Sequence, residues 1–126
     1  FDAKDINLEE YEAESSFHNA TGAGRGYAVA GGVADAIEKC IHEYYPDVEV
    51  NVEHAEGLAE CRKTLMLAKA GKMNGCLIEG MGCPGGCVAG AGTNIPVPKA
   101  QKKIKDFVKA STKSLPPKEL AEIELK

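Results

Sequence analysis

Apolar residues recur every three or four positions in three stretches of the chain, and this spacing is typical of helices with one buried face. It predicts helices at about residues 28–44, 56–70 and 98–111. Gly71 stands where the second helix would need a glycine cap. The expected apolar stripes are Val29, Val33, Ala36, Ile37, Cys40, Ile41 and Tyr44; Leu58, Cys61, Leu65 and Ala68; and Ala100, Ile104, Phe107 and Val108.

Gly31 and Gly32 lie within the first of these stretches, where each glycine costs about 1 kcal/mol relative to alanine. They indicate either the close approach of another backbone or ligand, or a helix that starts later. Residues 1–26 are acidic at first and then rich in glycine, which predicts only weak local order. Residues 118–125, after two prolines, are expected to add one or two turns.

Two short segments have strand patterns. Over residues 48–53, valine alternates with polar residues, as in a half-buried strand, and residues 76–78 form a short apolar run typical of a buried strand. Strand, helix and strand within about thirty residues predict a βαβ unit with parallel strands and a right-handed crossover. We therefore expect an α/β fold: a small sheet with a parallel βαβ unit and three or four helices packed on it.

The composition narrows the class of protein. A chain of 126 residues with 44% hydrophobic and 27% charged residues fits one soluble domain. The net charge of −4 gives no reason to expect nucleic acid or an anionic membrane as partner, and no apolar run is long enough for a membrane span. No signal peptide opens the chain, and five cysteines favour a reducing compartment, so we expect a cytoplasmic protein.

The segment Glu79–Thr93 carries the most distinctive chemistry. It holds Cys83 and Cys87 in a loop crowded with glycine and almost free of bulky side chains. Glycine lets a backbone press closely against a large object, and thiolates are the ligands that iron–sulfur clusters require. The loop follows the second strand, at the end where open α/β sheets bind ligands. These features predict part of an iron–sulfur site.

Simpler interpretations of the cysteines stay open. Cys83 and Cys87 can be incidental thiols or form a local disulfide, in an α/β module that binds protein partners. A cubane cluster normally takes four cysteines. Cys40, Cys61 and Cys76 lie in apolar patterns, where free cysteine usually packs as a small hydrophobe, so the missing ligands are expected from elsewhere.

The run Glu79-x-Met81-x-Cys83-Pro84-Gly85-Gly86-Cys87-x-x-Gly90-x-Gly92 resembles the third cysteine motif of the iron-only ([FeFe]) hydrogenase large subunit. Upstream, Ala30–Ala36 resembles the start of a helix in that family, and Thr21–Gly24 resembles the turn before it. The resemblance covers about residues 5–105 and is most specific at the cysteine loop.

The resemblance implies an H-cluster, a 4Fe–4S cubane joined through a cysteine sulfur to a two-iron unit. Cys83 would ligate the cubane, and Cys87 would ligate it and bridge to the two-iron unit. Met81 would line the reaction site, and Gly86 and Gly90 would belong to the cofactor-binding loop. The implied activity is that of a ferredoxin-type iron hydrogenase, which interconverts protons and electrons with H₂.

The chain also departs from the family pattern. Gly82, Ala91 and Thr93-Asn94 replace the usual residues, which is typical of a divergent branch, with a sensory role as one expectation. The family's first two cysteine motifs are not found. Residues 1–126, which open on Phe1, are therefore expected to be a C-terminal fragment of the H-cluster domain.

Further expectations follow from this resemblance. The fragment alone would be inactive and hold no cluster. Its partners would be H₂ and protons, the missing N-terminal part, a ferredoxin-like donor or linked iron–sulfur domains, and a second copy of itself through exposed apolar surface. A non-catalytic iron–sulfur scaffold used in cluster assembly is the alternative function.

Three other features have ordinary interpretations. The loop Thr21–Gly26 lacks the preceding strand of a nucleotide-binding fingerprint and is expected to pack as a turn. His18, His42 and His54 have no convincing metal-binding spacing, and His18 is the one near the glycine turn. The lysines of residues 99–113 are expected to form a solvated helix face, with docking of an acidic partner as the alternative.

Overall fold

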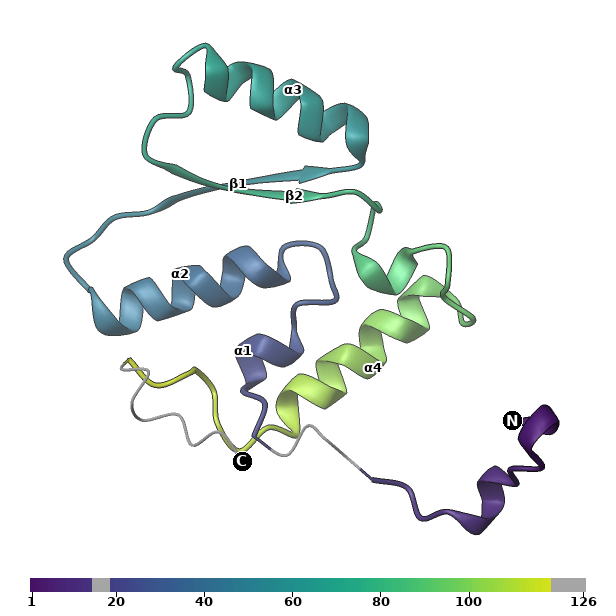
Figure 1. Ribbon diagram of the computed structural model, residues 1–126. Helices are drawn as coiled ribbons and strands as arrows, with labels where there is room; N and C mark the ends of the chain where they lie inside the picture. The colour runs from purple at the N-terminus through teal and green to yellow at the C-terminus, as the bar shows by residue number, and fades with distance from the viewer. Residues whose placement is uncertain (15–18, 119–126) are drawn as a thin grey trace.

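A computed structural model describes residues 1–14 and 19–118 of the chain. His18 and residues 119–125 of the expected C-terminal turns lie outside the described residues. The elements, drawn in Figure 1, are the 3-10 helices Asp2–Lys4 and Leu8–Glu10, α1 (Gly22–Arg25), α2 (Gly32–Tyr44), β1 (Asn51–Glu56), α3 (Leu58–Lys69), β2 (Cys76–Met81), the 3-10 helix Cys87–Ala89 and α4 (Val97–Lys109).

The two strands β1 and β2 pair in parallel, in a register that runs from Asn51 opposite Cys76 to Glu56 opposite Met81. Helix α3 connects the strands and covers one face of the sheet, and α2 lies against the other face (Figure 1). The expected α/β class, with a small sheet built on a parallel βαβ unit, is confirmed.

The first strand lies three residues later than the valine pattern predicts. It starts at Asn51, and Val48 is half exposed because it belongs to a turn in which its N–H donates to the carbonyl of Tyr45. The buried residue of β1 is Ala55, which is out of phase with the valines. Alternation fails as a guide here because helices pack on both faces of the sheet and because the strand is narrow, so exposed residues occur on both faces of β1.

Helix α2 starts later than its apolar stripe does. Gly31 has a φ of 85°, which interrupts the helical pattern and places the start at Gly32. A Cβ on Gly32 would lie 2.1 Å from the carbonyl oxygen of Gly26. The prediction that residues 28–31 are helical is therefore wrong. Both explanations offered for the glycine pair are confirmed, since another backbone approaches closely and the helix starts later.

Helix α3 ends as the sequence predicts. Gly71 has a φ of 74°, its N–H donates to the carbonyl of Ala68, and the N–H of Lys72 donates to that of Leu67, the two bonds of a Schellman cap.

The buried face of α3 matches the predicted stripe in part: Cys61 and Ala68 are half-buried, but the two leucines are not. Leu58 is 79% and Leu65 62% exposed, whereas Cys61 and Leu67 are half-buried. Since the described elements that α3 packs against are the two narrow strands, it buries a thinner face than its apolar residues offer.

Helix α1 contacts α4 and the segment after it through hydrogen bonds and a cation–π contact. The N–H groups of Gly22 and Ala23 donate to carbonyls in the segment after α4, at 2.7 and 2.9 Å. The guanidinium of Arg25 lies 4.4 Å from the centre of the Phe107 ring. The observed bounds of α4 are close to the predicted 98–111, and its inward face includes buried Ala100.

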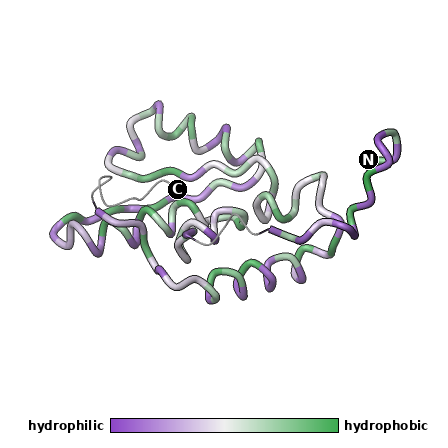
Figure 2. The backbone as a smooth tube through the Cα atoms, turned by 60° about the horizontal axis from the view of Figure 1, so that its bottom comes forward, coloured by the Kyte–Doolittle hydropathy of each residue, from purple (hydrophilic) through white to green (hydrophobic). Residues whose placement is uncertain are grey.

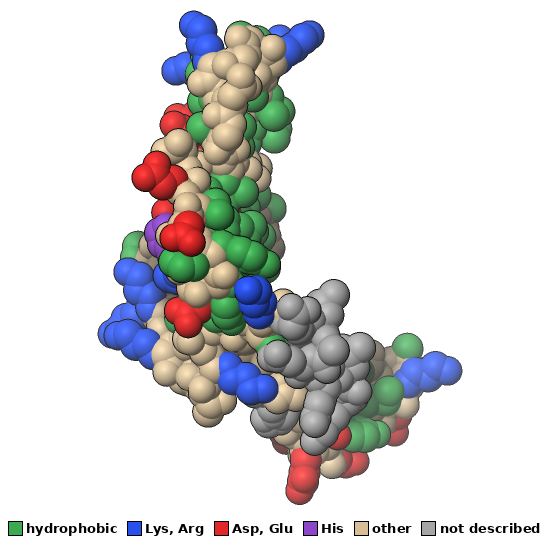
Figure 3. Space-filling model, turned by 90° about the vertical axis from the view of Figure 1, so that its left-hand side faces the viewer, with side chains coloured by type: hydrophobic (Ala, Val, Ile, Leu, Met, Phe, Trp, Pro, Cys, Tyr) green, Lys and Arg blue, Asp and Glu red, His purple; other side chains and the backbone are tan. Residues whose placement is uncertain are grey.

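The apolar core of the described residues is thin. Its buried hydrophobic members are the alanines Ala34, Ala36, Ala55 and Ala100, and within these residues no large side chain is fully buried. Hydrophobic side chains are instead open to view midway down the face in Figure 3, below α3. Residues 1–14 extend away from the packed elements and are exposed throughout (Figures 1 and 2).

Candidate metal centre

The cysteine loop leaves the carboxyl end of β2, as the sequence predicts, and both of its thiols are exposed and free. The chain turns sharply after Cys83, where the N–H of Gly86 donates to the Cys83 carbonyl at 2.9 Å. Gly85 and Gly86 have φ values of 88° and 93°, which residues other than glycine rarely adopt. Cys87 then opens a short 3-10 helix. The turn thus places both sulfur atoms on one short, solvent-accessible segment.

Three hydrogen bonds fix this loop to the body. The Gly85 N–H donates to Oε2 of Glu56 at 2.7 Å, which ties the loop to the end of β1. The Gly85 carbonyl accepts from the Ala30 N–H at 3.3 Å, and the Val88 N–H donates to the Ala28 carbonyl at 3.1 Å. The segment between the two cysteines is therefore held against the residues that lead into α2.

Gly86 shows how closely these backbones approach. A Cβ at this position would lie 2.4 Å from the Ala30 nitrogen and 2.6 Å from the Ala28 oxygen, closer than any real side chain can come. The requirement for glycine at position 86 therefore has a cause within the chain itself.

Gly90 lies instead beside the sulfur of Cys83 and the backbone of Cys87. A Cβ there would lie 3.6 Å from Sγ of Cys83 and 3.2 Å from the carbonyl oxygen of Cys87. Glycine at position 90 leaves the space next to both cysteines clear, as a loop that accommodates a bulky inorganic group requires.

Met81 is the last residue of β2 and is half-buried. Its carbonyl accepts from the Gly57 N–H at 2.8 Å, so the strand end is held by the turn that follows β1. The motif residues Met81, Cys83 and Cys87 thus belong to one anchored segment.

The other three cysteines are half-buried, and one of them, Cys61, lies at the base of the loop, where its Sγ is 3.9 Å from the carbonyl oxygen of Met81. Cys76 opens β2 at the opposite end of the strand, and Cys40 lies in α2. Sγ of Cys61 lies 3.5 Å from the Ala55 carbonyl, against the strand pair. These positions agree with packing roles, and all five cysteines of the described residues are free thiols.

The donor set fits part of an iron–sulfur centre. Two exposed thiols are soft ligands of the required kind. Within residues 1–14 and 19–118, however, no group of three or more His, Cys, Asp or Glu side chains is placed to hold a metal ion. Among the described residues, the loop therefore offers two thiols of the kind that a cubane takes as ligands.

Two polar contacts near the loop are not predicted from the sequence, although Glu79 is the first residue of the cysteine motif. His54 and Glu79 are register partners on β1 and β2, and His54 Nδ1 lies 3.2 Å from Oε2 of Glu79. Glu56 binds the cysteine loop from the end of β1. The strand register brings these residues together, so their spacing along the chain carries no signal.

The glycine-rich segment Thr21–Gly26 does not form a phosphate loop. Thr21 caps α1 by accepting from the Gly24 N–H at 3.1 Å. The amides of Gly22 and Ala23 already donate to the carbonyls of Lys113 and Ser114. The expectation of a packing turn agrees with these contacts.

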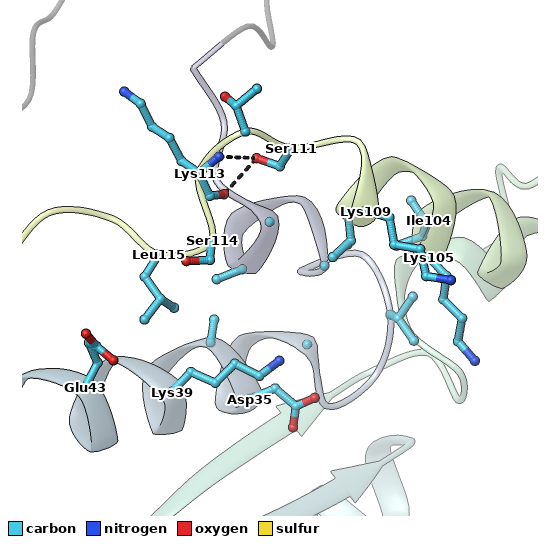
Figure 4. A pocket seen from close by; sticks show the side chains of 18 of the residues that line it. Asp35, Lys39, Glu43, Ile104, Lys105, Lys109, Ser111, Lys113, Ser114 and Leu115 are labelled. Carbon is cyan, nitrogen blue, oxygen red and sulfur yellow. Dashed lines mark hydrogen bonds between the residues drawn. The ribbon is translucent and has the colours of Figure 1, made fainter. Parts of the chain in front are cut away.

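An open cavity of about 930 Å³ lies between α1, α2, α4 and residues 111–115. Figure 4 shows Asp35, Lys39 and Glu43 projecting from α2, with Lys105 and Lys109 on the α4 side. Its lining includes glycines and alanines but neither Cys83 nor Cys87. The cavity is therefore a groove between helices, separate from the cysteine loop.

Comparison with known proteins places the chain in a family. No curated protein matches the chain. Among the described residues, no helix has the length and apolar character needed to cross a lipid bilayer. The family model for the C-terminal domain of the iron-only hydrogenase large subunit matches residues 1–91, a range that includes the cysteine loop and stops before α4. The chain belongs to this family, the C-terminal domain of the large subunit of iron-only hydrogenases.

Proposed function

We propose that this chain is the C-terminal part of the H-cluster domain of an iron-only hydrogenase, whose complete form interconverts protons and electrons with H₂. The observation that carries the proposal is the pair of exposed thiols on an anchored, glycine-rich loop at the carboxyl end of β2, inside the range that matches the family. When bound, the H-cluster would supply low-valent iron that forms or splits the H–H bond.

Different residues of the loop would have different roles in binding the H-cluster. Cys83 would ligate the cubane, and Cys87 would ligate it and bridge to the two-iron unit. Gly90 supports this proposal because it leaves the space beside Sγ of Cys83 open. Met81 would line the reaction site from the end of β2, and Gly86 would keep the loop against residues 28–30, where it makes its closest approach.

The open surface of the chain supports the view that other protein covers it. The solvent-accessible area is 9892 Å². The usual scaling for a compact protein of 13.3 kDa gives roughly 6,500 Å². Residues 1–14, which are exposed throughout, account for part of the excess, and the thin alanine core and the exposed apolar side chains agree with the rest. We infer that residues N-terminal to this segment in the parent protein cover these surfaces and bring the remaining cluster ligands.

Mutation of single cysteines in the complete protein, reconstituted without oxygen, tests the ligand roles. Each cubane should bind about four irons. Cys83→Ser and Cys87→Ser should each lower the iron content and bleach the cluster absorption. Cys76→Ser is the matched control, since Cys76 lies at the far end of β2 and should leave iron binding as in the wild type. An unchanged iron content in Cys83→Ser would contradict the proposal.

Infrared spectroscopy of the matured complete protein separates the enzyme from the alternative iron–sulfur scaffold. Both would bind a cubane through Cys83 and Cys87, but only the hydrogenase would carry the two-iron unit with its CO and cyanide ligands. Stretching bands of these ligands, together with H₂ evolution from a reduced donor, are the expected result. A cubane without those bands would identify a scaffold.

A further inference from the structure

Glu79 is a buried carboxylate close to the cysteine loop in sequence. It is the one polar or charged side chain that is buried in the described part of the chain, with 8% of the side chain exposed. A buried charge is costly unless hydrogen bonds and a partner compensate for it. The contacts of Glu79 therefore indicate what the carboxylate does.

Each oxygen of this carboxylate has its own partner. Oε1 accepts from the backbone N–H of Val33 at 3.2 Å, and Oε2 lies 3.2 Å from Nδ1 of His54. Val33 belongs to the first turn of α2, whereas Glu79 and His54 face each other across the strand pair. One side chain thus joins three elements.

Helix α2 needs such a partner because it has no side-chain cap of its own. Its N-cap is Gly31, which cannot supply a side-chain acceptor for the free N–H groups of the first turn. The carboxylate of Glu79 satisfies one of them, and its negative charge is favourable at the positive end of the helix dipole. The start of α2 is therefore fixed from β2.

The residues just before this start hold the cysteine loop. The N–H of Ala30 donates to the Gly85 carbonyl, and the carbonyl of Ala28 accepts from the Val88 N–H. Gly86 packs between them at a distance that leaves no room for a side chain. Any shift of the segment before α2 therefore shifts the backbone between Cys83 and Cys87.

We propose that Glu79 is a positioning residue for the cysteine loop: it fixes the start of α2, and the segment before α2 fixes the backbone between the two cysteines. The inference rests on the proposed function only for what the cysteines bind. The structural coupling itself is a property of this chain and requires no metal to test.

Two substitutions separate the reach of the side chain from its charge. Glu79→Gln keeps an oxygen at the same reach and can still accept from Val33. Glu79→Asp keeps the charge but is one methylene too short to contact both partners. Glu53→Gln is the control, because Glu53 is an exposed carboxylate on β1.

Amide hydrogen exchange, measured by NMR on the complete parent protein without its clusters, gives the readout. Glu79→Asp should speed exchange at Val33, Ala30 and Val88 together by at least about tenfold. The reference amide Ala70, which donates to the Met66 carbonyl in α3, should keep its wild-type rate. Glu79→Gln and Glu53→Gln should stay within about threefold of the wild type at all four amides.

Three outcomes would overturn the inference. Faster exchange at Val33 alone would mean that Glu79 caps the helix without positioning the loop. Faster exchange at Ala70 as well would mean general loss of stability. Unchanged exchange at Val33, Ala30 and Val88 in Glu79→Asp would mean that the loop does not depend on Glu79. A Glu79→Gln variant as loosened as Glu79→Asp would instead support the inference and show that the charge is needed as well as the reach. Unchanged iron binding in Cys83→Ser would contradict the proposed function and leave this exchange result intact, so the two failures are distinguishable.

Discussion

At the scale of single residues, glycine serves two different purposes in the cysteine loop. The motif marks Gly86 and Gly90 alike as part of a cofactor-binding loop. In the structure, Gly86 adopts a φ of 93° and a ψ of −169°, a conformation that is almost confined to glycine, and it packs against residues 28–30. Gly90 has ordinary dihedral angles and instead borders the sulfur of Cys83.

Replacing Gly86 with alanine should therefore disrupt the loop. The added Cβ would overlap the Ala30 nitrogen and the conformation would be strained, so the free energy of unfolding should fall by at least about 2 kcal/mol. Thermal unfolding followed by circular dichroism measures the change, and the melting temperature should fall by several degrees.

Gly92→Ala is the matched control for this substitution. A Cβ on Gly92 meets nothing within 4 Å, so the melting temperature should change little. Equal effects of the two substitutions would show that Gly86 does not make the close contact described.

At the scale of elements, α3 shows how a narrow sheet limits what a helix can bury. The predicted apolar stripe includes Leu65 and omits Leu67, yet Leu65 is 62% exposed while Leu67 is half-buried. Because β1 and β2 are the described elements that α3 packs on, one side of its apolar surface stays in water.

Truncation of these two leucines tests which face is buried. Leu67→Ala should lower the free energy of unfolding of this chain by about 1–2 kcal/mol, since part of its side chain is removed from water. Leu65→Ala should cost less than about 0.5 kcal/mol. Urea titration measures both, and a larger loss for Leu65→Ala would contradict the observed orientation of α3.

At the scale of the whole molecule, the described elements leave many large apolar side chains uncovered. Helices α2 and α4 diverge over the cavity of about 930 Å³, and the sheet of the described residues has only two strands. Sheets of two strands are marginal unless other elements cover them. The extended shape in Figure 3 and the alanine core agree with a fold that other protein completes.

The isolated chain should accordingly self-associate through its apolar surface. Sedimentation should show a mass that rises with concentration, and the dye ANS should bind. Addition of the N-terminal part of the parent protein should reduce both effects, because it would cover the same surface. A monomer at every concentration that binds no dye would contradict this expectation.

Sequence patterns predict well the elements that local chemistry governs. Helical spacing locates α2, α3 and α4 to within a few residues, apart from the start of α2, and Gly71 marks the cap of α3. The succession of strand, helix and strand predicts the parallel pair. The predicted bounds of β1 are three residues early, and Leu58 and Leu65 of the predicted α3 stripe are exposed, because burial there depends on which elements pack together and not on the apolar pattern along the chain.

The chemistry of the loop follows from the order of residues alone, since that order fixes the thiols, the glycines and their spacing. What holds the loop in place follows from the way the chain folds. Residues 28–30 and Glu56 are far from the cysteines along the chain, and Glu79 is far from the helix start that it contacts. The strand register and the start of α2 bring these residues together. Contacts of this kind depend on how elements pack, which local sequence patterns do not specify.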